Sequence, residues 1–593
     1  MSENSNRVGD SVPAEKKSGF TGICKRLWGG VSRAFRAVVG FYQIKATEAC
    51  YILSTFVIML AINYFLIAMN GFSLSYAKQW PGISCVGSVF WFLLFLLSFH
   101  FICRRNRWVL WLMTTAQFLV LFILFAVYLT TGTFFCESVL FLVYDTTWDE
   151  TKGFFSAYVN FKSLVLLVLV LVSFFSAMYF AMRKHKSPGK YCRGDLRALI
   201  TIAVLLLFPF VSSFRNGERN FFKTLFSSHP VHYICNQIGY FNRNMKEFIS
   251  EMRDRTPPDD VRLNDGFKGD GPVGVFVIGE SAIRSHHSVY GYHRDTTPNL
   301  TVRKDSIILF DDVICVLPVT ITALKYWLTD MTLADRHVKW TLFDVLKKAG
   351  YKVDIATNQN KSGWADSPIQ MIFKAADSVT YIHEENYSDL EEDKDARIYD
   401  EALIAPFDAW INKTGSVSTP QMMVLHLFGS HEPYASRYPK EFAEHFLSDA
   451  AFTQRVSEYD SSILYTDMVL GKLLERLEKI DRPAFLVYIS DHGSVCESPD
   501  LRNPQSRDNS AYEVPFFIWT NSRYREAMPD TVLRMQKRRS VPLQADRAHF
   551  GLLEMMGVSF SDDVETENFL SDRFEIKPRF IDEGSAPYVK DVE

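Results

Sequence analysis

Five long apolar runs fill much of the first 215 residues and constrain the fold more than any other feature of the chain. A helix that crosses a bilayer needs about 20 predominantly apolar residues, and a core helix of a soluble protein is rarely apolar on all sides over that length. The runs therefore predict a domain of five transmembrane helices. They cover residues 49–69, 84–103, 108–130, 162–182 and 198–214.

Lys and Arg concentrate in alternate short loops between these runs. The N-terminal arm, residues 1–48, and the loops 104–107 and 183–197 are rich in cations, whereas 70–83 and 131–161 contain one Lys each. Because cations favour cytoplasmic loops, the N-terminus is predicted to be cytoplasmic, and the chain beyond the fifth helix to lie outside. About 48 residues separate the N-terminus from the first apolar run, which is too long a distance for a cleaved signal peptide.

The part of the chain that follows the membrane runs has a different pattern. Residues 215–270 are polar and aromatic, which predicts a connector at the membrane surface, with a plain linker as the alternative. Residues 271–593 alternate strand and helix signals, which predicts an α/β domain with a mostly parallel sheet covered on both faces. The expected strands are VGVFVIG, YKVDIAT, MMVLHLFG, AFLVYIS and VPFFIW, with WTLFDVLKKAG and YTDMVLGKLLERLEK as helices. The net charge of −3 gives no indication of a nucleic-acid partner.

Polar side chains follow several of the expected strands directly. Glu280 follows VGVFVIG, Asn358 follows YKVDIAT, His426 lies within MMVLHLFG, and Asp491 and His492 follow AFLVYIS. Functional groups of open α/β sheets collect at the carboxyl ends of the strands. Carboxylates and an imidazole at one edge suit Zn²⁺, with Mn²⁺ or Mg²⁺ as alternatives.

Hydroxyl groups near this edge are candidate nucleophiles. Ser281 adjoins Glu280, and Thr320 and Thr322 lie at an expected helix start after Pro318. A metal-bound hydroxyl loses its proton more easily, and a helix N-terminus favours a phosphate group. The residues alone leave these nucleophiles open, because Thr at a helix start is most often a cap.

Six motifs together resemble the membrane-bound phosphoethanolamine transferases of the alkaline phosphatase and sulfatase superfamily. The resemblance covers essentially the whole chain and follows the family's order and spacing. The motifs are GESAIRSHHSVYGYHRDTTPNL, VTITALKYWLT, TNQNKSG, HLFGSHEPYASRYPKEF, YDSSILYTDMVLGKLLERL and YISDHG.

The resemblance implies a role for each matching residue. Thr320 is the expected nucleophile, with Thr322 as an alternative, and Ser281 becomes a neighbour of a metal ligand. His426 and His431 match the family's catalytic histidines. The implied metal ligands are Glu280, Thr320, Asp491 and His492, and the implied substrate contacts are Asn358, Lys361, Thr146 and Glu150.

Two departures from the family pattern affect the expected metal content. The segment before the nucleophile reads Cys315-Val-Leu-Pro-Val-Thr320, where members that modify lipid A have Cys-Gly-Thr-x-Thr. The family's further His beyond Asp491-His492 is missing, and Arg502 or Arg507 is the cation nearest to its place. We therefore expect one Zn²⁺ and leave a second open. The spacing in GESAIRSHHSVYGY is closer to members that modify the lipopolysaccharide core.

The implied activity is transfer of phosphoethanolamine from phosphatidylethanolamine, through a phosphothreonine-type intermediate, to lipopolysaccharide or another envelope glycan, with release of diacylglycerol. The implied location is the bacterial inner membrane, multi-pass, with a periplasmic catalytic domain and a monomeric chain. Such transfer would mask phosphate charge and reduce sensitivity to cationic peptides. A phosphoglycerol transferase or phosphate-ester hydrolase is the alternative. A sulfatase is disfavoured, because no Cys/Ser-x-Pro-x-Arg stretch surrounds Thr320. A membrane scaffold with an inactive catalytic domain is also disfavoured, because all four implied metal ligands are present.

Four cysteines fall on the predicted outer side, where disulfides persist. They allow three full pairings, and the sequence does not choose among them. His549, in ADRAHFGLLEMMGV, is expected to be structural on a packing helix. The four cysteines are Cys136, Cys235, Cys315 and Cys496.

Overall fold

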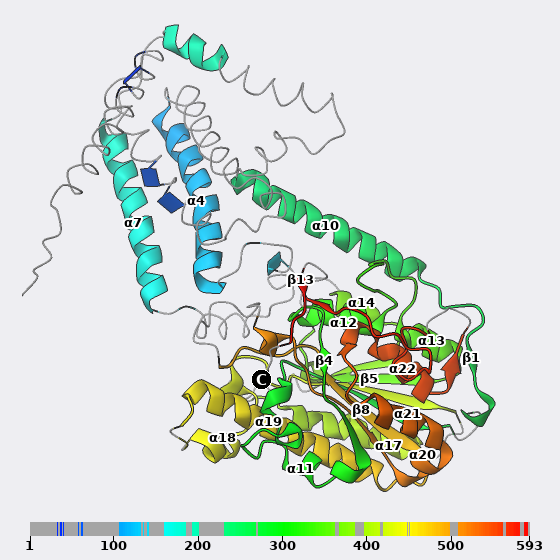
Figure 1. The fold of residues 1–593 in the computed structure, drawn as a ribbon. Coiled ribbons are helices and arrows are strands. Elements are labelled where there is room, and N and C mark those ends of the chain that lie inside the picture. Colours follow the sequence, from blue (N-terminus) through cyan, green and yellow to red (C-terminus); the bar gives the residue numbers. More distant parts are fainter. Residues whose placement is uncertain are drawn as a thin grey trace, which may run out of the picture. The chain divides into compact units, whose positions relative to one another are not determined.

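The structure is a computed structural model whose chain divides into two compact units, residues 1–128 with 162–236 and residues 129–161 with 237–593 (Figure 1). It describes residues 33, 36–37, 40, 57–58, 61–62, 106–131, 135, 139–140, 159, 161–184, 193–200, 230–267, 271–361, 367–385, 397–414, 419–447, 449, 451–497, 508–560, 565–581 and 586–590.

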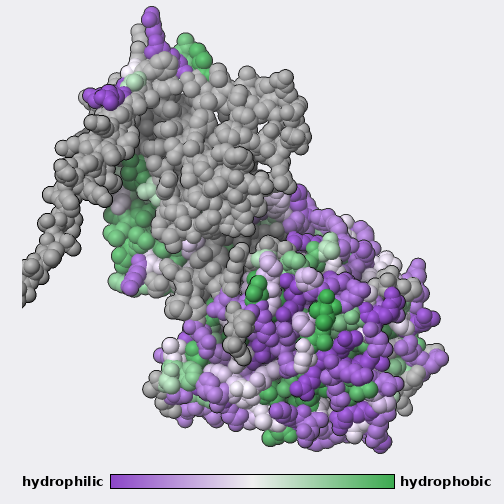
Figure 2. All heavy atoms as spheres, in the orientation of Figure 1, coloured by the Kyte–Doolittle hydropathy of each residue, from purple (hydrophilic) through white to green (hydrophobic). Residues whose placement is uncertain are grey.

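Two long apolar helices dominate the described part of the first unit. They are α4 (Arg107–Thr131) and α7 (Phe161–Lys184), and each contains a span of 20 residues that is long and apolar enough to cross a membrane. Phe118 of α4 stacks on Phe174 of α7 with ring centroids 3.6 Å apart, while the opposite side of α7 exposes apolar side chains (Figure 2). These helices confirm the runs 108–130 and 162–182 as helical. The other three predicted runs lie largely outside the described residues.

A seven-stranded mixed sheet forms the centre of the second unit. All its strands run in one direction except β9, which is antiparallel to both neighbours. The five predicted strands are present, and two short ones, β3 and β6, were not predicted. In spatial order the strands are β3 (Ile307–Phe310), β9 (Phe516–Thr520), β8 (Ala484–Ser490), β2 (Val273–Gly279), β7 (Gln421–His426), β5 (Lys352–Thr357) and β6 (Ser378–Tyr381).

Helices cover both faces of this sheet, as the continuous apolar runs of its central strands require. In β2, Phe276 and Ile278 join the core on one face, and Val275 and Val277 join the core on the other. The first face carries α12 (Thr320–Leu328), α13 (Leu342–Lys348), α14 (Pro368–Phe373), α20 (Ser522–Ala527), α21 (Pro529–Arg538) and α22 (Ala548–Met555). The second carries α11 (Pro298–Thr301), α17 (Ile404–Thr414) and α19 (Gln454–Leu477).

Short elements complete the unit. They are β1 (Arg262–Leu263) paired with β11 (Val558–Ser559), β4 (Val313–Ile314) with β10 (Leu543–Gln544), β12 (Phe580–Ile581) with β13 (Ala586–Pro587), and the helices α15 (Ile382–Glu385) and α18 (Lys440–Leu447).

The predicted connector contains a long amphipathic helix, α10 (Pro230–Asp254). Met245, Phe248 and Met252, spaced three and four residues apart on one helix face, are buried in the core of the second unit. The ammonium group of Lys325, on α12, lies 5.0 Å from the centre of the Phe248 ring. The C-terminal half of α10 therefore packs into the core of the second unit.

His549 is buried on α22 beside Trp340, as expected for a structural residue, and burial lowers its pKa to about 3. The unfolded chain binds a proton at this residue below about pH 6.5, and the folded chain does not, so stability is lost as the pH falls from 6.5 toward 3. We expect His549→Leu to reduce the loss of unfolding free energy between pH 7 and pH 5 by on the order of 1–2 kcal/mol. Denaturant titrations at both pH values test this, with the exposed His445→Leu as the control. The prediction would be wrong if His549→Leu left the difference in unfolding free energy between pH 7 and pH 5 unchanged.

Candidate active site

The ends of two neighbouring parallel strands bring the acidic residues of the site together. Gly279, the last residue of β2, is in register with Ser490, the last residue of β8, so Glu280 and Asp491 leave the sheet side by side. The Asp491 amide donates to Gly279 O at 3.0 Å, and the Ser281 amide donates to Asp491 Oδ1 at 3.0 Å. The carboxyl edge of the sheet thus holds two carboxylates next to each other, as predicted.

All four predicted metal ligands meet at this edge. One ligand atom each of Glu280, Asp491 and His492 lies within 4.8 Å of the other two. His492 Nε2 is 3.4 Å from Glu280 Oε1 and 3.4 Å from Asp491 Oδ2. Thr320 Oγ1 is 3.1 Å from Glu280 Oε2 and 3.4 Å from His492 Nε2. A single divalent ion among these atoms would reach every one of them.

The chemistry of the ligand set fits such a cation. Burial and the neighbouring Asp491 carboxylate raise the pKa of Glu280 well above its usual value, because two buried negative charges repel each other. Asp491 Oδ2 is buried and has no hydrogen-bond partner within the described residues. His492 Nδ1 lies 2.6 Å from Gly493 O, which fixes the proton there and leaves the Nε2 lone pair directed at the carboxylates. An imidazole with two carboxylates is a donor set that suits Zn²⁺.

Thr320 is the first residue of α12, and its hydroxyl does not cap the helix. It instead meets Glu280 and His492, at a helix end that favours negative charge. The alternative nucleophile, Thr322, is on the same helix but is only 8% exposed. The structure therefore brings Thr320, rather than Thr322, to the ligands.

Ser281 supports the Glu280 carboxylate. Its hydroxyl donates to Glu280 Oε1 at 2.7 Å, and its backbone has a positive φ of 55°, which non-glycine residues rarely adopt. Tyr459 Oη accepts from the Ile283 amide at 2.7 Å and donates to Ser281 O at 2.9 Å, which holds this turn. Ser281 thus lies beside the ligands with its hydroxyl occupied by one of them.

The loop after β7 passes directly over Glu280. The Ser430 amide donates to Glu280 O at 2.9 Å, and Gly429 has a φ of 51° in the same turn. A Cβ on Gly429 would lie 2.8 Å from Glu280 O, so the close approach requires glycine. This contact places the loop that contains His431 next to Glu280, one of the predicted metal ligands.

The two predicted catalytic histidines occupy different environments. His426, the last residue of β7, is 1% exposed, with Nδ1 3.2 Å from Thr357 Oγ1. His431 is half-buried, its Nδ1 is 2.7 Å from Glu432 O, and Arg437 donates to its backbone carbonyl. Burial lowers the pKa of each to about 4. Both rings are therefore neutral at pH 7, and His431 is the one with an exposed part.

The predicted substrate contacts are placed differently from one another. Asn358 is fully buried and donates to Asp400 Oδ1 at 2.8 Å, so its side chain supports the β5 end from inside. Lys361 is exposed, with its ammonium group 5.3 Å from the centre of the Tyr381 ring. Thr146 and Glu150 lie outside the described residues.

Gln359 is a site residue that the sequence analysis missed. Its Nε2 donates to Glu280 Oε2 at 3.2 Å and to Leu427 O at 3.1 Å. Gln359 lies two residues beyond the end of β5, at a bend in the chain. No sequence pattern connected it to the predicted ligands.

The described cysteines of the predicted outer side are not paired. Cys235, Cys315 and Cys496 are all free thiols. Cys136 lies outside the described residues.

Comparisons with known proteins relate the chain to one family of domains and to solved structures of the same fold. Residues 272–548 match the Sulfatase family. The phosphoethanolamine transferase EptC of Escherichia coli O18:K1:H7 is 25% identical over 433 residues, which are 68% of this chain and 72% of that protein. A zinc complex of the C-terminal periplasmic domain of Escherichia coli EptC has the same fold, with a TM-score of 0.50, 23% identity, and coverage of 56% of this chain and 96% of that one. The integral membrane lipooligosaccharide phosphoethanolamine transferase A of Neisseria meningitidis also shares the fold, with a TM-score of 0.55, 18% identity, and coverage of 89% and 97%.

Proposed function

We propose, from the premise that residues 272–548 form a sulfatase-family domain homologous to phosphoethanolamine transferases, that this protein transfers phosphoethanolamine from phosphatidylethanolamine to lipopolysaccharide. One observation carries the proposal. The Thr320 hydroxyl lies at a helix N-terminus within 3.1 Å of Glu280 Oε2 and 3.4 Å of His492 Nε2. A hydroxyl held against metal ligands in this way is arranged as a nucleophile.

Glu280, Thr320, Asp491 and His492 would hold one Zn²⁺, which supplies a lowered hydroxyl pKa and stabilisation of phosphoryl charge. Thr320 Oγ1 attacks the phosphorus atom of the donor, the bond from phosphorus to the glycerol oxygen breaks, and diacylglycerol leaves with a proton. The phosphoethanolamine group is then bonded to Thr320.

The second step reverses the role of Thr320. A hydroxyl or phosphate oxygen of the acceptor attacks the same phosphorus atom, and Thr320 leaves and takes up a proton. His431, neutral at pH 7 and on the loop that crosses Glu280, is suited to accept the acceptor's proton. The fully buried His426 is suited only to a supporting role behind it.

The proposed location is the bacterial inner membrane, with the N-terminus in the cytoplasm, several membrane crossings and a periplasmic catalytic unit. Support comes from α4 and α7, which each contain an apolar span of 20 residues, and from the cation distribution between the apolar runs. Donor and acceptor are then both membrane lipids, so a monomeric chain can bind them in turn from the same surface.

Intact-mass spectrometry of the full-length chain tests the proposal. The detergent-solubilised protein is incubated with Zn²⁺ and a phosphatidylethanolamine analogue, and the adduct is located by peptide fragmentation. A gain of one phosphoethanolamine group on Thr320 supports the proposal. A glycerol phosphate adduct formed from phosphatidylglycerol would establish the phosphoglycerol transferase instead. Release of diacylglycerol without any adduct or acceptor product would indicate a hydrolase.

Replacing Ser281 with Ala should have a mild effect. The change removes one hydrogen bond to the Glu280 carboxylate, and such bonds contribute about 1.5–3 kcal/mol at most, so we expect transfer to fall by roughly 10-fold and no more than about 100-fold. Steady-state transfer of a labelled head group measures this. A complete loss in Ser281→Ala, with the Thr320→Ala variant active, would show that the assigned roles are reversed.

A further inference from the structure

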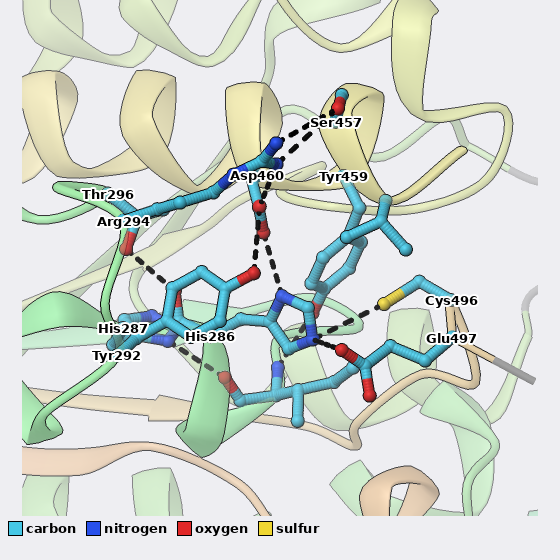
Figure 3. Close-up of polar contacts among 12 residues, drawn as sticks. His286, His287, Tyr292, Arg294, Thr296, Ser457, Tyr459, Asp460, Cys496 and Glu497 are labelled. Atoms are coloured by element: carbon cyan, nitrogen blue, oxygen red, sulfur yellow. Dashed lines mark hydrogen bonds and ion pairs between the residues drawn. The ribbon is translucent and has the colours of Figure 1, made fainter. Parts of the chain in front are cut away.

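His286 is at the centre of a buried polar network that the mechanism above does not use (Figure 3). Its ring is 2% exposed, and Nδ1 lies 2.7 Å from Asp460 Oδ1 on α19. The other oxygen of Asp460 accepts from Tyr292 Oη at 3.0 Å and from Arg294 Nη1 at 2.7 Å. The Asp460 carboxylate therefore has three donors, of which His286 is one and is the one that binds Oδ1.

The second ring nitrogen of His286 points at another loop. Nε2 lies 3.6 Å from Cys496 Sγ and 3.5 Å from Glu497 Oε1. Burial lowers the pKa of His286, but the bonds to Asp460, Cys496 and Glu497 outweigh it and raise the pKa to about 12. Both nitrogens therefore carry protons and donate at the same time, one to α19 and one to the loop (Figure 3).

The ring also links two chain segments that each begin at predicted metal ligands. His286 lies in the segment that begins at the ligand Glu280, and Cys496 and Glu497 lie in the segment that begins at the ligands Asp491 and His492. A ring held between these segments resists any change in their separation. The separation matters, because His492 Nε2 and Glu280 Oε1 are only 3.4 Å apart.

We propose that His286 is a positioning residue for the metal centre, because its ring joins the segment after Glu280 to the segment after His492 and so sets the distance between metal ligands. This inference rests on the proposed function, since it requires that Glu280, Asp491 and His492 bind the ion. Arg294 provides a matched comparison within the same network. Its hydrogen bonds are with Asp460, Asp449 and Ser457, and its guanidinium lies over the rings of Phe446 and Phe452. All of these residues lie outside the segment 491–497.

The test uses His286→Asn in the full-length, detergent-solubilised chain, because the Asn amide retains a donor near the position of Nδ1 and loses the reach of Nε2. Asp460 then remains paired, and the fold is preserved. Zn²⁺ affinity is measured by competition with a chelator, and hydrogen exchange of peptides covering 281–287 and 491–497 is measured in the zinc-free protein. The Arg294→Lys variant is the control, and Glu497→Gln, which changes a largely exposed side chain, is a second variant that puts no core contact at risk.

We expect His286→Asn to weaken Zn²⁺ binding by about 10-fold, the lower end of the loss caused by removing a direct hydrogen-bond partner of a metal ligand, and to speed exchange in 491–497. Glu497→Gln should weaken binding by a few-fold, and Arg294→Lys should lower the melting temperature with Zn²⁺ affinity unchanged within about twofold. Equal losses of affinity in His286→Asn and Arg294→Lys, or unchanged exchange in 491–497, would overturn the inference. If the unaltered chain binds no Zn²⁺ and His286→Asn still speeds exchange in 491–497, then His286 joins the two segments and the proposed function is wrong.

Discussion

The Thr320→Ala variant is expected to lose phosphoethanolamine transfer by roughly 10³-fold or more while it still folds and inserts into the membrane. The reason is chemical rather than structural. Thr320 is half-buried at the start of α12, its hydroxyl caps nothing in the helix, and its partners are Glu280 and His492. Removing the hydroxyl removes the atom that would bond to phosphorus and leaves the helix contacts in place.

Transfer of a labelled head group to purified lipopolysaccharide, in membranes that contain equal amounts of each variant, measures this loss. Thr320→Ser retains a hydroxyl and should recover part of the activity. Thr322→Ala is the matched control on the same helix, and because Thr322 is buried, its effect should appear in stability and not in the chemical step. Activity in Thr320→Ala together with loss in Thr322→Ala would transfer the nucleophile's role to Thr322.

The Asp491→Asn variant should show two opposite effects. Zn²⁺ affinity should fall by more than roughly 100-fold, because a charged ligand is lost. Removing a residue that only hydrogen-bonds a ligand typically costs less than that. The zinc-free protein should become more stable, because Asp491 and the buried Glu280 repel each other and raise the pKa of Glu280. The Asn side chain can still accept the amide protons of Ser281 and His492 through its oxygen.

Melting temperatures with chelator and with excess Zn²⁺ separate the two effects. Excess Zn²⁺ should raise the melting temperature of the unaltered chain more than that of the variant. In chelator, the variant should have the higher melting temperature. The control is Asp467→Asn on α19, a buried carboxylate that accepts from the Asn299 and Leu300 amides outside the metal centre. It should reduce stability equally with and without Zn²⁺. Lower stability of Asp491→Asn in chelator would mean that the carboxylates do not oppose each other.

The strands that build the site could be predicted because they are buried on both faces. Every residue of β2 and of β8 is buried, so each appears in the sequence as an unbroken apolar run with an abrupt end. The residues after those ends, Glu280 and Asp491, could then be identified by position alone. β3 and β6 escaped prediction because each has four residues and half-buried positions, which leaves no distinct pattern.

Contacts between distant segments account for what the sequence could not reveal. From the residues alone, Thr320 was one of several candidate nucleophiles, and only the resemblance to a family singled it out. Its distance from Glu280 Oε2 could be known only from the structure. Gln359 and Asp400 have no sequence pattern that connects them to the site. Asp400 accepts hydrogen bonds from the Phe428 and Gly429 amides and so orders the loop after β7. In the sequence it cannot be distinguished from an acidic residue on the surface.

The packing of α10 has a consequence for how such a chain can be divided and recombined. Met245, Phe248 and Met252 fill part of the core beside α12, so a chimaera joined at residue 270 would combine a catalytic unit with a foreign helix shaped for a different surface. Each of the three side chains contributes about 1.5–3 kcal/mol by its burial, which is a large share of the stability of a typical domain. The connector helix and the catalytic unit should therefore be inherited, exchanged and expressed as one piece.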